Sequence, residues 1–156
     1  MDFLVQNIMS KAEGGDPIAM YQIANYYDIG LLPDTSDGKY IYWFKRFWDT
    51  PEVKATVYNI ESDEYNDETA DPMLEMLLRS YIVEAGLALG LYYMNSTNIR
   101  EATFALECFS SAWSASAFDY LTVEDMDGTT DIQQLIRKQQ AWLKELEVSS
   151  NASSDE

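Results

Sequence analysis

The chain has 156 residues, about the length of one domain with a single core. Its 47% of hydrophobic residues exclude a chain that is disordered throughout. The 27 acidic and 10 basic residues give a formal net charge of −17, which repels nucleic acid and anionic membranes and attracts basic proteins. Solubility alone is the alternative explanation of that charge.

The N-terminal end is predicted to form two short helices. Apolar residues recur at helical spacing from Asp2 to Ala12, and Gly14-Gly15 ends that segment. Asp16 followed by Pro17 is a typical helix start, because the carboxylate can accept an early backbone N–H and proline fits the first helical position. This second helix should end at about Asp28.

Two further helices and an acidic loop are predicted next. Asp37 is expected to cap a helix that runs through Trp48 and carries one broad apolar stripe. Thr50-Pro51 starts another helix, which should end near Ile60. Residues 61–71 hold six acids and no base, so they are predicted to form a solvated loop.

Asp71-Pro72 repeats the cap-and-proline start and opens an apolar run from Met73 to Met94. Ser80 is the point at which this run would bend or break. A helix from about Ile99 to Ala112 follows, and then a shorter segment to residue 120.

The C-terminal part is predicted as an acidic loop, "TVEDMDGTTD" (122–131), and one last helix. Thr130 with Gln133 three residues later resembles a capping box for that helix. The polar tail at 148–156 is expected to be disordered. No stretch alternates with period two, so the predicted fold class is all-α, with about seven to eight helices in a single domain over residues 1–147.

Two stretches match each other at a fixed offset, "IAMYQIANYY" (18–27) and "EAGLALGLYY" (84–93), and each precedes a second helix. Small residues coincide, which would let the second helix approach closely, and the rings would fill the space between neighbouring pairs. The paired positions are Ala19 and Ala85, Tyr21 and Leu87, Ile23 and Leu89, Ala24 and Gly90, Tyr26 and Tyr92, Tyr27 and Tyr93, Phe44 and Leu106, and Phe47 and Phe109.

The first copy, "GDPIAMYQIANYYDIG" followed by "YIYWFKRF", resembles the Sel-one-like repeat, a longer relative of the tetratricopeptide repeat. The second copy lacks the Gly-Asp start and the closing Gly, and Ala105 replaces the aromatic Trp43. The resemblance covers about half of the chain. It implies a solenoid of helical hairpins that binds proteins or peptides on its inner face and is not catalytic. The matching positions are Gly15, Asp16, Ala19, Ile23, Ala24, Tyr27, Gly30, Trp43, Phe44 and Lys45.

The sequence lacks the residue types that most catalytic and metal sites require. The sequence has no histidine, which excludes histidine acid–base catalysis and most transition-metal sites. Residues 123–134 resemble a calcium loop, but Val123 takes the first ligand position and Gln134 the place of the bidentate glutamate, so a capped loop is favoured. Cys108 lies on an apolar helix and is predicted to be a buried, unreactive thiol. We expect no cofactor and no metal.

The candidate binding surface combines acidic loops with aromatic rings. Residues 40–48 carry more rings than one helix face can bury, and exposed rings anchor many protein interfaces. Core rings and solvated charges are the alternative interpretation. The candidate partner-binding residues are Glu61, Asp63, Glu64, Asp67, Glu68, Tyr42, Trp43, Trp48, Glu124, Asp125 and Asp127.

The sequence favours a non-enzymatic protein that uses an acidic face to bind a basic protein partner, and neither nucleic acid nor membrane is expected as a partner. The single cysteine, the N-terminus without a basic region and the lack of a long apolar run predict a cytoplasmic location. An immunity protein that neutralises a bacterial toxin is the narrower hypothesis, by analogy.

Three alternatives stay open at this point. The first alternative is a general peptide-binding adaptor or co-chaperone whose acidity serves solubility. The second is a structural role in which exposed rings pair with another copy of the chain. An enzyme that uses only carboxylates and tyrosines is the third alternative.

Overall fold

The computed structural model of the protein describes residues 3–33, 38–62, 71–116, 122–125 and 128–154, of which 122–125, 128–129 and 151–154 are described in their backbone only. Within these residues the chain is helical, as predicted, with seven helices and one short pair of strands. The elements are α1 (Phe3–Glu13), α2 (Pro17–Asp28), α3 (Lys39–Trp48), α4 (Pro51–Ser62), α5 (Pro72–Tyr93), α6 (Ile99–Ala115), β1 (Thr122–Asp125), β2 (Gly128–Asp131) and α7 (Ile132–Ser154).

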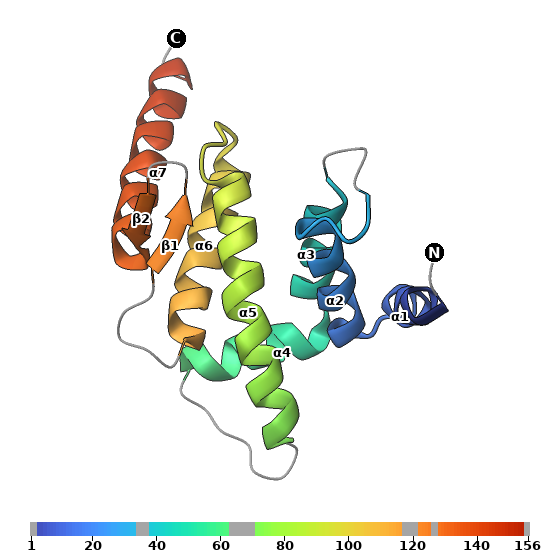
Figure 1. Cartoon of the computed structure of the whole chain (residues 1–156). Coiled ribbons are helices and arrows are strands. Elements are labelled where there is room, and N and C mark those ends of the chain that lie inside the picture. Colours follow the sequence, from blue (N-terminus) through green and yellow to red (C-terminus); the bar gives the residue numbers. More distant parts are fainter. Residues whose placement is uncertain (1–2, 34–37, 63–70, 117–121, 126–127, 155–156) are drawn as a thin grey trace.

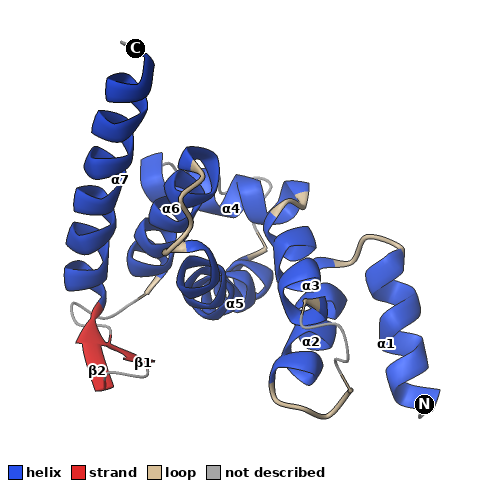
Figure 2. Ribbon diagram, turned by 90° about the horizontal axis from the view of Figure 1, so that it is seen from above, coloured by secondary structure: helices blue, strands red, loops and turns tan. Residues whose placement is uncertain are grey.

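Two pairs of helices form the centre of the molecule. Helix α2 packs along α3, and α5 packs along α6 (Figure 2). Helix α3 also contacts α5, so the two pairs lie side by side, with α1 against α2 at one end and α7 against α6 at the other. Helix α4 crosses from the first pair to the second and contacts both α5 and α6 (Figure 1).

The predicted cap-and-proline starts are confirmed. The Asp16 carboxylate accepts the backbone N–H of Ile18 at 3.0 Å, and Pro17 is the first residue of α2. The Asp71 carboxylate accepts from the N–H groups of Met73 and Leu74 at 3.1 and 3.3 Å, with proline again at the start of α5. These contacts satisfy backbone donors that the first turn of a helix leaves without a partner.

Two other predicted caps are wrong. The N-cap of α3 is Gly38, and the predicted Asp37 lies outside the described residues. Helix α7 starts at Ile132 and is capped by Asp131, whose carboxylate accepts from Gln133 N at 2.9 Å, so the predicted cap Thr130 lies one residue too early.

The course of α5 and α7 also differs from the prediction. Helix α5 continues through Ser80 without a break, because Leu78 and Ile82 on either side of it are both buried in the core while Ser80 faces solvent. Helix α7 continues to residue 154, seven residues past the predicted boundary at 147. The first half of the predicted short segment to residue 120 belongs to α6, which continues to Ala115, and the second half, residues 117–120, lies outside the described part.

The segment predicted as the acidic loop "TVEDMDGTTD" forms a hairpin instead. Strand β1 pairs antiparallel with β2, with Thr122 opposite Asp131 and Asp125 opposite Gly128. Strands of four residues carry too little alternation for a period of two to be recognised. The hairpin leads directly into α7 (Figure 1).

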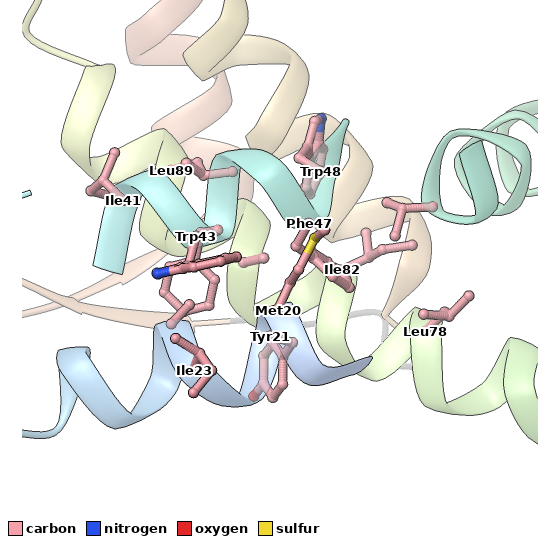
Figure 3. Packing of buried hydrophobic residues seen from close by; sticks show 14 of the residues in the cluster. Met20, Tyr21, Ile23, Ile41, Trp43, Phe47, Trp48, Leu78, Ile82 and Leu89 are labelled. Carbon is pink, nitrogen blue, oxygen red and sulfur yellow. The ribbon is translucent and has the colours of Figure 1, made fainter. Parts of the chain in front are cut away.

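The main core lies where α2, α3, α4 and α5 meet. The Phe47 ring of α3 is fully buried, and its centroid lies 6.0 Å from that of Tyr21 on α2 and 6.4 Å from that of Tyr81 on α5. Tyr21 stacks on Tyr81 with the ring centroids 3.7 Å apart, and the Tyr21 hydroxyl donates to the Glu84 carboxylate of α5. Figure 3 shows Met20 of α2, Phe47 of α3 and Ile82 of α5 converging in this core.

Two glycines of α5 let α6 approach closely, as predicted for Gly90. A Cβ atom at Gly90 would lie 2.5 Å from the nearest atom of the Phe109 ring, and one at Gly86 would lie 2.8 Å from the Cys108 carbonyl oxygen. Phe109 is fully buried and also packs against Ile132 of α7. The second pair of helices is thus held by a near contact of helix backbones, with α7 covering its outer side.

Candidate partner-binding surface

Only one of the three aromatic residues predicted to bind a partner is exposed. Tyr42 is 55% exposed, whereas Trp43 is 6% and Trp48 is 9% exposed. The prediction that both tryptophans face a partner is wrong, because α3 packs between α2 and α5 and both rings belong to the core cluster. The Arg46 guanidinium lies 4.9 Å from the Trp43 ring centroid and 5.9 Å from that of Tyr42.

The basic residues of α3 sit against aromatic rings. Lys39 lies 5.4 Å from the Tyr27 ring centroid, and Lys45 lies 4.5 Å from the Phe104 ring centroid. Lys45 also pairs with Asp49 at 2.9 Å. The surface around Tyr42 is therefore richer in positive charge than the chain as a whole, which separates this exposed ring from the predicted acidic face.

The predicted acidic residues are only partly described. Glu61 is exposed at the end of α4, where its carboxylate accepts a hydrogen bond from Ser111 of α6 at 3.1 Å. This bond gives Glu61 a role in holding α4 to α6. Glu124 and Asp125 lie on β1, beside α7 and away from α3 (Figure 1), and their side chains are not described. The others lie outside the described residues: Asp63, Glu64, Asp67, Glu68 and Asp127.

Exposed carboxylates are spread over most of the helices, so the described residues show no single acidic cluster. The chain has 17 more acidic residues than basic ones, so most acids cannot have a basic partner. Exposed acidic residues of the described part are Glu13, Asp28, Asp49, Glu52, Glu61, Asp71, Glu84, Glu101, Glu107, Glu145 and Glu147.

An exposed apolar face at the start of α5 was missed by the sequence reasoning. Met73 is 81% exposed, Met76 is 73% and Leu77 is 37%. Their spacing of three and four residues places them on one side of the helix. The available signal was the run "MLEMLL" (73–78), which has more apolar residues than one helix face can bury.

An open groove of about 760 Å³ lies between the start of α6 and the end of α7. Two hydrogen bonds hold its walls together: the Trp142 indole N–H donates to the Ser96 carbonyl at 2.8 Å, and the buried Gln139 amide donates to the Ala102 carbonyl at 2.9 Å. The groove is lined by Thr97, Asn98, Ile99, Arg100, Leu146, Ser149 and Ser150.

The titratable groups in the core do not form a reactive centre. Cys108 is buried, as predicted, and burial together with the neighbouring Glu107 raises the pKa of its thiol far above the ordinary value, so the nucleophilic thiolate does not form. Burial also raises the pKa of Tyr81 and of Tyr93. Outside the core, partial desolvation at the end of α2 raises the pKa of the exposed Asp28. Within the described ranges, no three metal-ligating side chains come together.

No protein-family model, curated protein or solved structure matches this chain. The resemblance to the Sel-one-like repeat therefore stays a prediction that rests on the residues quoted for it. Among the described helices, none combines the length and the apolar character needed to cross a membrane.

Proposed function

We propose that this protein is a non-enzymatic binding module whose acidic surface captures a basic protein partner. The observation that carries the proposal is the net charge of −17 on a chain whose described acids are mostly exposed. A field of this sign speeds the encounter with a basic protein and disfavours acidic competitors. The absence of histidine from the sequence and the buried Cys108 thiol support a binding role over a catalytic one.

The narrower form of the proposal is a cytoplasmic immunity protein that occludes a basic bacterial toxin. Such a protein must bind before the toxin acts, and electrostatic steering provides fast capture. The proposal also assigns α2–α3 and α5–α6 to a Sel-one-like helical-repeat solenoid. Its support is that paired positions share full burial, namely Ile23 with Leu89 and Phe47 with Phe109.

The test is a pull-down from the cytosol of the source organism at low and at high salt. We expect proteins of high isoelectric point to be enriched at low salt and lost at high salt, because exposed charges are screened. Enrichment of no basic protein at low salt would overturn the proposal.

Two variants that each remove four negative charges sharpen the test. A greater loss of binding in the first than in the second places the contact at residues 63–68, whereas equal losses assign capture to the overall charge. The first variant carries Asp63→Asn, Glu64→Gln, Asp67→Asn and Glu68→Gln, and the second carries Glu13→Gln, Glu107→Gln, Glu145→Gln and Glu147→Gln.

The groove between α6 and α7 favours a second candidate function, a peptide-binding adaptor or co-chaperone whose acidity serves solubility. Its lining is mostly uncharged, with Ile99 and Leu146 beside hydroxyl groups. This function requires binding that changes little with salt and weakens when Ile99 is replaced by serine. Salt-sensitive binding that is unaffected by Ile99→Ser would exclude it.

A further inference from the structure

The start of α5 extends beyond the part of the helix that matches α2. Val83 is the position that corresponds to Pro17, the first residue of α2, so residues 72–82 have no counterpart in the first pair. Figure 1 shows this end of α5 extending past α4. The extension therefore needs its own explanation.

One side of the extension is already used by the core. Leu78 and Ile82 are buried, and Leu74 packs against the same cluster, which includes Val53 of α4. These residues, spaced by four, form one face of the helix. Met73, Met76 and Leu77 lie on the other side and remain exposed.

The exposed face continues a face that is covered elsewhere on the same helix. Leu91 follows Met73 by 18 residues, which is about five full helical turns, so both project from the same side of α5. Leu91 and Leu87 pack against Phe109 of α6 and Ile132 of α7. The C-terminal half of this face is thus partly buried by two helices, while among the described residues the N-terminal half has no equivalent cover.

The charge around this face indicates what would cover it. From residue 71 to residue 84, which the structure describes throughout, the chain has three acidic residues, Asp71, Glu75 and Glu84, and one basic residue, Arg79. Asp71 and Glu84 are both exposed. A second copy of the chain would bring two charges of −17 together, which opposes self-association. Methionine side chains adapt to partners of different shape, which suits a docking surface.

We propose that the face formed by Met73, Met76 and Leu77 docks a basic amphipathic helix of a protein partner. The apolar side of that helix would cover the three side chains, and its lysines or arginines would lie near Asp71 and Glu84. This inference rests on the proposed function and names the site at which the basic partner is held.

The probe is a synthetic peptide of leucine and lysine with leucines at i, i+3, i+4 and i+7, together with a scrambled peptide of the same composition. Binding is measured by calorimetry and by the NMR signals of the methionine methyl groups, of which the chain has seven. We expect the amphipathic peptide to bind at least about tenfold more tightly than the scrambled one and to shift the Met73 and Met76 signals most.

Substitutions separate this face from other exposed apolar residues. Replacement of Met73, Met76 and Leu77 by glutamine should weaken the amphipathic peptide at least about tenfold without unfolding the chain, because glutamine favours helix and the three sites are exposed. A matched variant with Phe3→Gln, Leu4→Gln and Val148→Gln removes as many exposed apolar side chains and should bind like the wild type. Met73→Leu with Met76→Leu should retain binding.

The outcomes distinguish this inference from the proposed function. Equal, salt-sensitive binding of both peptides that the glutamine variant leaves unchanged overturns the docking face but keeps acidic capture. Binding that depends on the face but not on salt keeps the apolar contact with Met73, Met76 and Leu77, and it overturns both acidic capture and the charge contact with Asp71 and Glu84. Sedimentation that shows self-association of the wild type but not of the glutamine variant assigns the face to a second copy and overturns the inference.

Discussion

Helices α2 and α3 and helices α5 and α6 bury corresponding positions but are held together in different ways. In the first pair, Tyr21 of α2 meets the rings of Phe44 and Phe47 of α3, each at a centroid distance of 6.0 Å. In the second pair, Gly86 and Gly90 bring α5 against the backbone and the Phe109 ring of α6. Packed aromatic rings fill the first contact. The second depends on two glycines, whose lack of a side chain lets the helices approach closely.

The two pairs also differ in what covers them. Phe47 lies at the junction of the pairs, where it meets Tyr21 and Tyr81, while Phe109 lies between α5 and the added helix α7. Equivalent phenylalanines thus serve different interfaces. Phe47 and Phe109 show that two matched positions can both be buried while different helices cover them.

The largest expected effect is the loss of either phenylalanine. Phe47→Ala and Phe109→Ala should each lower the free energy of unfolding by about 3–5 kcal/mol, because each ring is fully buried. Hydrogen exchange should accelerate first in α2 for Phe47→Ala and first in α7 for Phe109→Ala. Tyr58→Ala, at a residue that is 60% exposed, is the control and should change stability by no more than about 0.5 kcal/mol. The same exchange pattern in both variants would contradict the assignment of the rings to separate interfaces.

A smaller effect is expected where α6 meets the glycines. Gly86→Ala and Gly90→Ala should each destabilise the protein by about 1–3 kcal/mol, because the added Cβ would collide with the Cys108 carbonyl or the Phe109 ring. This loss should exceed the gain of about 1 kcal/mol that alanine brings to a helix. Ser80→Ala, on the exposed side of α5, is the control and should be neutral or slightly stabilising. Thermal unfolding that shows Gly90→Ala to be more stable than the wild type would refute the close approach.

The smallest effect concerns alkaline pH. Burial raises the pKa of Tyr81 at the junction and of Tyr93 in the second pair. Above about pH 10 an unfolded tyrosine loses its proton while these two retain theirs, so the folded state binds more protons and stability falls as pH rises. Tyr81→Phe with Tyr93→Phe should flatten this fall in denaturant unfolding. A slope that is unchanged in the double variant would contradict the prediction.

The helix starts could be predicted because their cause is local. Asp16 and Asp71 each stand directly before a proline, and each accepts a hydrogen bond within the next three residues. Gly90 could be predicted because its match with Ala24 required a small residue on the face toward the second helix. Such features depend on neighbours in the sequence or on one regular period.

The candidate site could not be predicted to the same degree, because exposure depends on contacts between distant elements. The ring pattern of α3 does not indicate that both α2 and α5 pack against it, so it cannot tell that Trp43 and Trp48, both candidate partner-binding residues, are buried. Conversely, Met73 and Met76 sit in an apolar run that resembles a core helix, yet in the folded chain they face solvent. The hairpin at 122–131 was missed because its strands are too short to show a period.

The burial of Cys108 has a practical consequence for the second pair of helices. It is the only thiol of the chain, and its backbone lies against Gly86 of α5. A thiol reagent can reach it only when the helices packed around α6 open locally, so the rate of labelling reports the opening equilibrium of this part of the core in the unmodified protein. Cys108 is therefore a built-in probe of local unfolding. A partner that stabilises α5 should slow the labelling of Cys108, and a partner that separates the helices should accelerate it.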